Sequence, residues 1–304
     1  MPPEPCLMKV SGFSFIRNGI KYDYPFIEAI LSIEPLCDEI IVAVGSGDDQ
    51  TRDKVAELNS KIGNKIKIID TIWDDSLREG GKVLAKETDK AYSTISVDTD
   101  WCIYIQGDEV LHENSIPILK KAMQTELNNS KTEALLVNYN HFYGSYDYVG
   151  DSTRWYRREI RVLRRRMDFF SFKDAQGFRA RSEKGNRKLN SKLTNATMHH
   201  YGWVKDPRAM QKKQETFHKL WHTDQWMQEN IPKADAFDYT NIDSLQKFTG
   251  THPEVMKSRI NKVNWQFDHD ISRNVASTKE KIRRWIEKKT GWRIGEYKNY
   301  KLIR

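Results

Sequence analysis

Residues Glu39–Thr51 have the sequence EIIVAVGSGDDQT. The first part is a run of β-branched and apolar residues, which predicts a buried β-strand. The Gly-Ser-Gly sequence at Gly45–Gly47 predicts a loop at the end of that strand, and a helical pattern begins at Thr51. A strand, a loop and a helix in this order form the first part of a βαβ unit, from which parallel sheets are built.

The same alternation continues on both sides of this stretch. Further strands are predicted at Lys9–Ile16, Lys65–Asp70, Trp101–Ile105 and Ala134–Asn138. Helices are predicted at Tyr24–Ile33, Thr51–Leu58, Gly81–Thr94 and Ser115–Leu127. Strands separated by helices predict a Rossmann-like α/β fold, with a mostly parallel central sheet that is covered by helices on both faces.

The regular alternation stops near residue 141. Short strands are expected at Ile160–Leu163, around Phe178 and at Thr197–Tyr201. Helical patterns then predominate, at Pro207–Trp221, Pro253–Lys262 and Thr278–Lys289. We therefore expect one α/β domain over residues 1–205 and a helical C-terminal extension over residues 206–304 that packs on it.

The composition is that of a folded chain with an uneven charge. Of the 304 residues, 38% are hydrophobic and 11% aromatic, which excludes an intrinsically disordered chain. Residues 1–150 carry 15 Lys and Arg against 24 Asp and Glu, a net charge of −9, whereas residues 151–304 carry 35 against 18, a net charge of +17. A basic half predicts contact with phosphates, nucleic acid or an anionic lipid surface; a solvated basic surface is the alternative.

The cysteines and the N-terminus suggest a cellular compartment. Cys6, Cys37 and Cys102 have no spacing that is typical of a disulfide framework or of a thiolate zinc site. No apolar run is long enough for a membrane-spanning helix, and Met1–Val10 contains no secretory signal pattern. We therefore expect a cytoplasmic protein in a reducing environment.

Polar side chains follow predicted strands at their carboxyl ends, where open parallel sheets bind ligands. These ends are Arg17-Asn18, Gly45–Asp49 and Gln106–Glu109. At the last of them, an apolar strand places the Asp108 carboxylate where it can hold a divalent metal that bridges the two phosphates of a nucleotide. An acidic turn that merely ends the strand is the alternative.

Four segments in a fixed order carry a family resemblance. They are FIRN at Phe15–Asn18, GSGDDQT at Gly45–Thr51, LREGGK at Leu77–Lys82 and WCIYIQGDEVL at Trp101–Leu111. Together they resemble the family 2 glycosyltransferases, over roughly residues 8–205. The resemblance implies a GT-A fold and transfer of a sugar from a nucleotide-diphosphate donor to a hydroxyl acceptor. It also implies Mg²⁺ or Mn²⁺ as cofactor, inversion at the anomeric carbon, and a saccharide or a lipid-linked molecule as acceptor.

The fourth segment is similar to the Asp-x-Asp metal motif of that family. On this resemblance Asp108 is the metal ligand and Glu109 assists in binding the donor. Gln106 stands where the family has the first Asp of the motif, and Ala43-Val44 replaces the Asp that usually precedes the Gly-Ser turn. These departures support one alternative function, a catalytically inactive GT-A scaffold.

The other segments provide candidates for donor binding. The second is similar to the nucleotide-binding turn, in which Asp48 or Asp49 would contact the base or the ribose. Arg17 lies at the end of the first strand. Arg78 and Lys82 match the basic position after the third strand, and they lie four residues apart, as on one helix face. Cations there would stabilise the charge that grows on the leaving diphosphate; a pair of surface cations is the alternative.

The general base is expected later in the chain. Asp174 lies in SFKDAQGFRA, between aromatic and basic residues and before a glycine turn. Inverting GT-A enzymes take a carboxylate from this region to remove the proton of the acceptor hydroxyl, so Asp174 is our candidate; an Asp that caps the turn is the alternative. The other carboxylates considered are Glu159, Asp168 and Glu183.

The segment MHHYGWV, Met198–Val204, predicts the end of a strand with two adjacent histidines. Side chains alternate along a strand, so only one of the two can face the site. The resemblance implies a late histidine as a further metal ligand or diphosphate contact, and we choose His200. A histidine that is packed in the core is the alternative.

The basic second half has two notable segments. Arg154–Arg166 contains seven arginines, and we expect it near the acceptor side, in contact with an anionic ligand. Lys281–Trp292, KIRRWIEKKTGW, predicts a basic helix with Ile282, Trp285 and Ile286 on one stripe. Such a helix suits peripheral membrane contact, at the inner face of the membrane, or docking on the domain.

A nucleic-acid-binding protein is the remaining alternative. The basic second half is its only support, because zinc-finger spacing and an RNP-like strand are both absent from the sequence. The acidic first half opposes it. We therefore expect no nucleic-acid partner.

Overall fold

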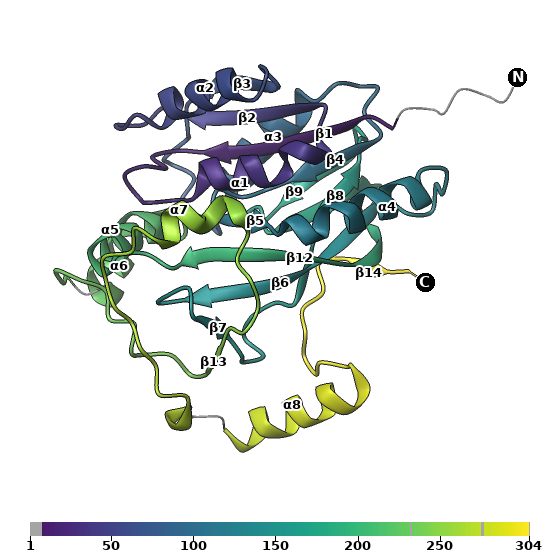
Figure 1. Cartoon of the computed structure of the whole chain (residues 1–304). Helices are drawn as coiled ribbons and strands as arrows, with labels where there is room; N and C mark the ends of the chain where they lie inside the picture. Colours follow the sequence, from purple (N-terminus) through teal and green to yellow (C-terminus); the bar gives the residue numbers. More distant parts are fainter. Residues whose placement is uncertain (1–7, 232, 275–276, 304) are drawn as a thin grey trace, which may run out of the picture.

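The computed structural model describes residues 8–231, 233–274 and 277–303. Cys6 and most of Met1–Val10 lie outside these residues. The helices are α1 (Phe26–Ile33), α2 (Thr51–Lys61), α3 (Lys82–Ser93), α4 (Ile116–Glu126), α5 (Pro207–Phe217), α6 (Asp224–Asn230), α7 (Lys257–Ile260) and α8 (Thr278–Thr290) (Figure 1). The strands are β1 (Val10–Ile16), β2 (Glu39–Gly45), β3 (Ile66–Thr71), β4 (Trp101–Tyr104), β5 (Glu109–Leu111), β6 (Ala134–Tyr143), β7 (Tyr148–Gly150), β8 (Arg158–Arg164), β9 (Phe169–Phe172), β10 (Gly177–Ser182), β11 (Gly185–Lys188), β12 (Asn190–Trp203), β13 (Leu245–Lys247) and β14 (Lys301–Leu302).

In the described residues, an 11-stranded sheet forms the centre of the molecule. Its strands β4, β1, β2 and β3 lie side by side and pair in parallel. β8 joins them through antiparallel pairing with β4 and β6, and β12 pairs in parallel with β6. The expected α/β class, with a mostly parallel sheet flanked by helices, is confirmed.

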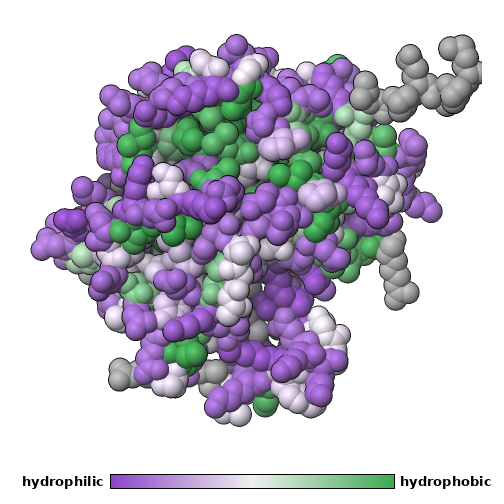
Figure 2. Space-filling view, in the orientation of Figure 1, coloured by the Kyte–Doolittle hydropathy of each residue, from purple (hydrophilic) through white to green (hydrophobic). Residues whose placement is uncertain are grey.

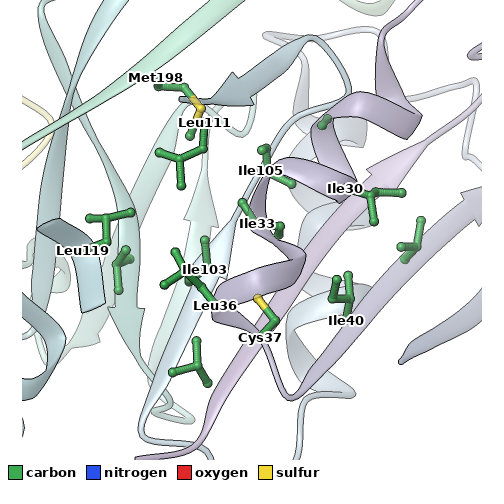
Figure 3. Close-up of a cluster of buried hydrophobic side chains, with 14 of the residues drawn as sticks. Ile30, Ile33, Leu36, Cys37, Ile40, Ile103, Ile105, Leu111, Leu119 and Met198 are labelled. Atoms are coloured by element: carbon green, nitrogen blue, oxygen red, sulfur yellow. The ribbon is translucent and has the colours of Figure 1, made fainter. Parts of the chain in front are cut away.

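Both faces of the sheet are buried, and side chains alternate between them. On β2, Ile40 and Val42 pack in the cluster beneath α1, while Ile41 and Ala43 pack in the cluster beneath α3. Figure 3 shows the first cluster, in which Ile30 and Ile33 of α1 lie over the sheet. Burial on both faces explains why the strands are continuous apolar runs. The parallel pairing of β1 with β4 places the carboxyl ends of these two strands at one edge of the sheet.

The C-terminal residues contain less helix than their sequence patterns predict. The helix expected at Pro253–Lys262 is reduced to a 3₁₀ turn and the short α7. The following residues are irregular because aromatic side chains tie them to the sheet. Trp265 donates a hydrogen bond to the carbonyl of Gly144, at 2.9 Å, and Phe267 packs on Tyr148. Tertiary packing thus overrides local helix propensity here.

Two short strands also return from the C-terminal residues to the sheet. β13 pairs with β7 and β14 pairs with β12. In Figure 1, α8 lies beyond β7 and β13, away from the layered body. Within the described residues, no helix is long and apolar enough to cross a bilayer.

Candidate active site

A cavity of about 670 Å³ opens where β1 and β4 end. One wall consists of residues that follow these strands and of the end of β12. The opposite wall is α5 and the turns that connect it to α6. Five of the residues proposed for catalysis, donor binding or metal binding line this cavity: Arg17, Arg78, Asp108, Asp174 and His200. The sheet therefore brings together groups that are up to 183 positions apart in the chain.

Asp108 and His200 face each other across the cavity floor. His200 Nε2 lies 3.7 Å from Asp108 Oδ2, which is too long for a hydrogen bond. Their approach depends on Gly202, because a Cβ atom there would lie 2.7 Å from both Asp108 Oδ2 and His200 Nε2. Among the described residues, no group of three or more His, Cys, Asp or Glu side chains could hold a metal. At this point of the cavity floor a carboxylate oxygen and an imidazole nitrogen face each other.

His141 fixes the orientation of the His200 ring. Burial and the facing His200 ring hold the pKa of His141 well below its usual range, so His141 is neutral. Its Nε2 lies 2.8 Å from the carbonyl of Tyr156 and must donate to it. Its Nδ1 is then the acceptor for the Nδ1–H of His200, at 3.1 Å. The other ring nitrogen of His200, Nε2, is the atom that faces Asp108.

Two buried lysines lie beside this pair, and the sequence had not singled them out. Lys213 Nζ donates to the carbonyl of Gly202, at 2.8 Å, and lies 3.8 Å from Asp108 Oδ2. Lys205 Nζ donates to the carbonyl of Asp23, at 2.6 Å. Burial on its own would raise the pKa of Asp108, but His200, Lys213 and Lys205 hold it well below its usual range. Asp108 is therefore an anion.

Both lysine ammonium groups lie over the ring of Tyr24. The distance from Nζ to the ring centre is 4.3 Å for Lys205 and 5.1 Å for Lys213. Burial, together with the charge of Lys213, lowers the pKa of Lys205 to about 7. Burial also lowers the pKa of Lys213, against the attraction of Asp108. Desolvated cations next to an open cavity are suited to an anionic ligand, because that ligand can replace the water they have lost.

Arg17 and Arg78 also line the cavity, and each pairs with one carboxylate. Arg17 binds Asp75, at 2.7 Å, and lies over the ring of Trp73. Arg78 binds Asp224 of α6, at 2.7 Å, and the carbonyl of Lys219. Helix α3 begins only at Lys82, so Arg78 and Lys82 do not share a helix face as expected.

Other donor-binding candidates lie away from the cavity. Among the described residues, its lining includes none of Asp48, Asp49, Lys82 and Glu109. Asp48 pairs with Lys21, which lowers the pKa of Asp48. Asp49 accepts hydrogen bonds from the backbone of Lys21 and Thr51, and the exposed Lys82 pairs with Glu79. These contacts tie loops together at the surface.

Glu109 points into the core of the sheet. Its carboxylate binds the guanidinium of Arg161 through two hydrogen bonds, of 2.7 and 2.8 Å, and accepts a third from Tyr139. Both partners of this ion pair are almost completely buried. Because its oxygens are occupied, Glu109 supports the strand edge that carries Asp108.

Asp174 lies in the turn between β9 and β10 and reaches the cavity. Burial raises its pKa, although the backbone of Asp174 and Gln176 and the charge of Lys173 oppose the rise. Gly81, which has a left-handed φ of 67°, makes room for it, since a Cβ on Gly81 would lie 2.7 Å from the Cβ of Asp174. A carboxylate with a raised pKa accepts a proton more readily.

The alternatives to Asp174 lie outside the described cavity lining. Asp168 pairs with Arg166, and Glu183 is exposed. Glu159 is buried in the sheet, where burial raises its pKa to about 8 against the nearby charge of Arg161. One of its oxygens accepts from Gln176, at 3.0 Å, and the other has no hydrogen-bond partner among the described residues.

The arginine run has structural roles that differ from our expectation. In the part of the chain that the structure describes, none of its seven arginines lines the cavity. Arg164 donates to the carbonyl of Leu127 beyond α4 and stacks on Trp101, 3.8 Å from the ring centre. Arg165 donates to the carbonyls of Ser93 and Ile95 at the end of α3. Cations are favourable there because helix carboxyl ends carry unpaired carbonyls.

Aromatic side chains also line the cavity. Phe15 lies 5.9 Å from Trp73, and Phe217 lies 4.3 Å from Trp221, as ring centres. The sequence had not assigned Trp73 to a site, nor Lys205, Lys213 or His141. For the lysines and for His141 no sequence pattern carried the information, because their role depends on burial and on contacts between distant segments.

Known proteins are similar to this chain in structure only to a limited extent. No family model matches the chain, and no curated protein sequence matches it. S. aureus TarS is similar in structure, with a TM-score of 0.43 and 11% sequence identity over 68% of this chain and 38% of that chain. S. aureus TarS 1–349 in complex with UDP-GlcNAc has a TM-score of 0.34 and 19% identity, over 48% of this chain and 38% of that one.

A third solved structure is glucosyl-3-phosphoglycerate synthase from Mycobacterium tuberculosis, in complex with Mn²⁺, UDP and phosphoglyceric acid. Its TM-score is 0.30, with 18% identity over 44% of each chain. This chain thus spans less than half the length of each of these three proteins.

Proposed function

We propose that this chain is a glycosyltransferase of family 2, which transfers a sugar from a nucleotide-diphosphate donor to a hydroxyl acceptor. The observation that carries the proposal is the position of Asp108. Its anionic carboxylate lies in the turn between β4 and β5, on the floor of the cavity, and faces His200 at 3.7 Å. The order of the four sequence segments adds support that does not depend on the cavity.

Asp108 and His200 would hold the divalent metal, Mg²⁺ or Mn²⁺. The geometry fits a shared cation, because the facing atoms are too far apart for a hydrogen bond and the contact of His200 with His141 uses Nδ1, not the Nε2 that faces Asp108. Such ions are often bound by one or two protein ligands, with phosphate oxygens and water completing the shell. A bound metal would supply neutralisation of the diphosphate charge.

Lys213, Arg17 and Arg78 would act on the same diphosphate. All three line the cavity and carry positive charge when protonated. Preformed cations stabilise the charge that develops on a leaving group, and they are most effective where water is excluded. Lys213 is the most buried of the three, so it contributes most in this account. Lys205 lies behind it and supports the ring of Tyr24.

The acceptor hydroxyl would lose its proton to Asp174. Its raised pKa and its position in the cavity lining support a role as general base. A base that acts on the face opposite to the leaving group gives inversion. The rings of Phe15 and Trp73 offer a stacking surface for a nucleobase, since such rings bind the flat face of any base.

The domain assignment and the partners belong to this proposal. Residues 1–205 would form the GT-A domain, and residues 206–304 an extension whose α5 closes the cavity. The partners would be a nucleotide-sugar donor and a saccharide or lipid-linked acceptor, and the location the cytoplasm.

A donor screen tests the function. Melting temperatures are measured with UDP-, GDP-, CMP- and dTDP-sugars, each with and without Mn²⁺, because a ligand that binds the folded state raises the melting temperature. For any donor that stabilises the protein, the release of its nucleotide is then measured in the presence of simple saccharide acceptors. The proposal expects stabilisation by one donor class and slow release of nucleotide.

An inactive scaffold is the second candidate, and Gln106 favours it. The amide nitrogen of Gln106 donates to the hydroxyl of Tyr104 and to the carbonyl of Ala175, both at 3.2 Å, so it braces the site in place of an acidic ligand. A donor that binds with Mn²⁺ but is never cleaved, by hydrolysis or by transfer, would support the scaffold instead.

A further inference from the structure

Helix α8 docks on the body through charged side chains. Glu280 accepts hydrogen bonds from the backbone and the hydroxyl of Thr153, both at 2.7 Å. Arg284 binds Asp151, at 2.7 Å, and Glu287 binds Arg157, at 2.9 Å. Over its whole described length, α8 contains no buried residue. The face that meets the body is therefore polar.

The apolar stripe of α8 points the other way. Ile282 and Trp285 are three residues apart and share one helix face, and their exposed fractions are 53% and 63%. Trp292, just beyond the left-handed cap at Gly291, is 59% exposed. A surface helix of a globular protein normally buries its apolar face and exposes its charges. In α8 this orientation is inverted, so the apolar side chains of the docked helix remain exposed to solvent.

Lysines surround this stripe. Lys281, Lys288 and Lys289 are exposed. The helix has two acidic residues, Glu280 and Glu287, and both are engaged with the body. Figure 2 shows that the surface at the lower end of the molecule, over α8 in Figure 1, is predominantly hydrophilic. The outward face is thus a small apolar stripe in a basic field.

We propose that the outward face of α8, defined by Ile282, Trp285, Trp292 and the three lysines, binds the surface of an anionic lipid bilayer. Tryptophan is suited to the boundary between headgroups and acyl chains, and lysines near it are attracted to anionic headgroups. A second copy of the chain is a poor occupant, because a symmetric contact would bring the lysines of both copies together. The proposal does not depend on the proposed catalytic function.

The docking contacts also connect α8 to the segment that reaches the cavity. Arg157 pairs with Glu287, and the preceding residue, Tyr156, lines the cavity. Arg293 adds hydrogen bonds to Glu287 and to the carbonyl of Trp155, both at 2.7 Å. A helix that is held in this way presents its face without folding on the membrane, which lowers the entropy cost of binding.

The test is co-sedimentation of the full chain with two kinds of vesicle, phosphatidylcholine alone and phosphatidylcholine mixed with phosphatidylglycerol. The face variant is Trp285→Ser with Lys288→Gln and Lys289→Gln. The matched control is Val97→Ser with Lys120→Gln and Lys121→Gln, which removes the same charge at exposed sites elsewhere. Melting temperatures establish that both variants are folded.

We expect the parent and the control to bind the mixed vesicles, with binding that weakens as salt is added, and the face variant to bind on the order of tenfold more weakly. Equal binding by face variant and control would overturn the proposal, as would absence of binding to mixed vesicles or equal binding to both vesicle types. A concentration-dependent dimer that only the face variant loses would assign the face to a second copy instead. Binding of an RNA oligonucleotide that only this variant loses, without vesicle binding, would assign it to nucleic acid.

Discussion

Nε2 of His200 and Oδ2 of Asp108 lie 3.7 Å apart, and both would lie 2.7 Å from a Cβ atom at position 202. The glycine is thus part of the site, although it carries no functional group. It lets a side chain from the β4–β5 turn and one from β12 approach each other, in a position that suits a shared cation. His141 holds the ring of His200 from behind, at 3.1 Å.

The first prediction concerns this glycine. Gly202→Ala must displace the Asp108 carboxylate, the His200 ring or both, because the two contacts are shorter than side chains tolerate. We expect nucleotide binding in the presence of Mn²⁺ to weaken while binding without Mn²⁺ changes little. Calorimetric titration of the nucleotide, with and without the metal, measures both. An alanine variant with full metal enhancement would mean that the pair is not a metal site.

The second prediction concerns Asp174. A general base acts on the chemical step, so Asp174→Asn should lower kcat by a factor of about 10²–10⁴ and leave donor affinity nearly unchanged. Asp168→Asn is the matched control, since Asp168 pairs with Arg166 outside the described cavity lining. If Asp174 only caps its turn, the variant should instead have a lower melting temperature and a normal kcat per folded molecule.

The third prediction concerns Lys213. Lys213→Met should weaken nucleotide-diphosphate binding by about 1.5–3 kcal/mol, the range for hydrogen bonds to charged groups. Lys82→Met is the control, because Lys82 is exposed and pairs with Glu79. Binding of the nucleoside, which lacks phosphates, is measured for the same two variants. Equal losses for diphosphate and nucleoside would indicate that Lys213 supports the cavity wall and does not contact the phosphates.

The fourth prediction concerns the pH dependence of stability. Burial raises the pKa of Glu159 from 4.5 to about 8, so between these values the folded state holds a proton that the unfolded state has released. The folded state binds more protons in this window, and the free energy of unfolding therefore falls as the pH rises through it. The change is on the order of a few kcal/mol, because one pKa unit corresponds to about 1.4 kcal/mol.

Glu159→Gln removes this dependence. Urea unfolding at both ends of the window should show the variant gaining stability relative to the parent as the pH rises. Glu183→Gln, at an exposed position, is the control and should follow the parent at both pH values. A constant difference between Glu159→Gln and the parent would mean that Glu159 is ionised in the folded protein.

Local patterns were sufficient for the parallel core. The apolar run before Gly45 and the similar runs on either side of it predicted the strands and helices in the observed order, because buried parallel strands are continuous apolar runs. The C-terminal third was predicted less well. The segment that contains Trp265 and Phe267 is held by contacts with β6 and β7, which no local pattern encodes.

The candidate site was also predictable only in part. The place of Asp108 in the cavity lining was predictable because it follows a buried strand, and that of His200 because side chains alternate along a strand; their roles stay predictions. The position of Lys213 in the site was not predictable from the sequence. Lys213 lies on α5, whose composition is that of a solvated helix, and it is buried because α5 packs against the cavity. Charge alone also misled the interpretation of Arg164 and Arg165, which bind carbonyls at helix ends.

The central claim is that Asp108 anchors a metal-assisted nucleotide site, and calorimetric titration tests it most directly. UDP, GDP, dTDP and CMP are titrated into the parent and into Asp108→Asn, each with and without Mn²⁺. The account predicts that one nucleotide binds the parent more tightly with Mn²⁺, and that Asp108→Asn loses this enhancement while its melting temperature shows that it is folded. An Asp108→Asn variant that keeps the Mn²⁺ enhancement, or a parent that binds none of the four nucleotides, would contradict it.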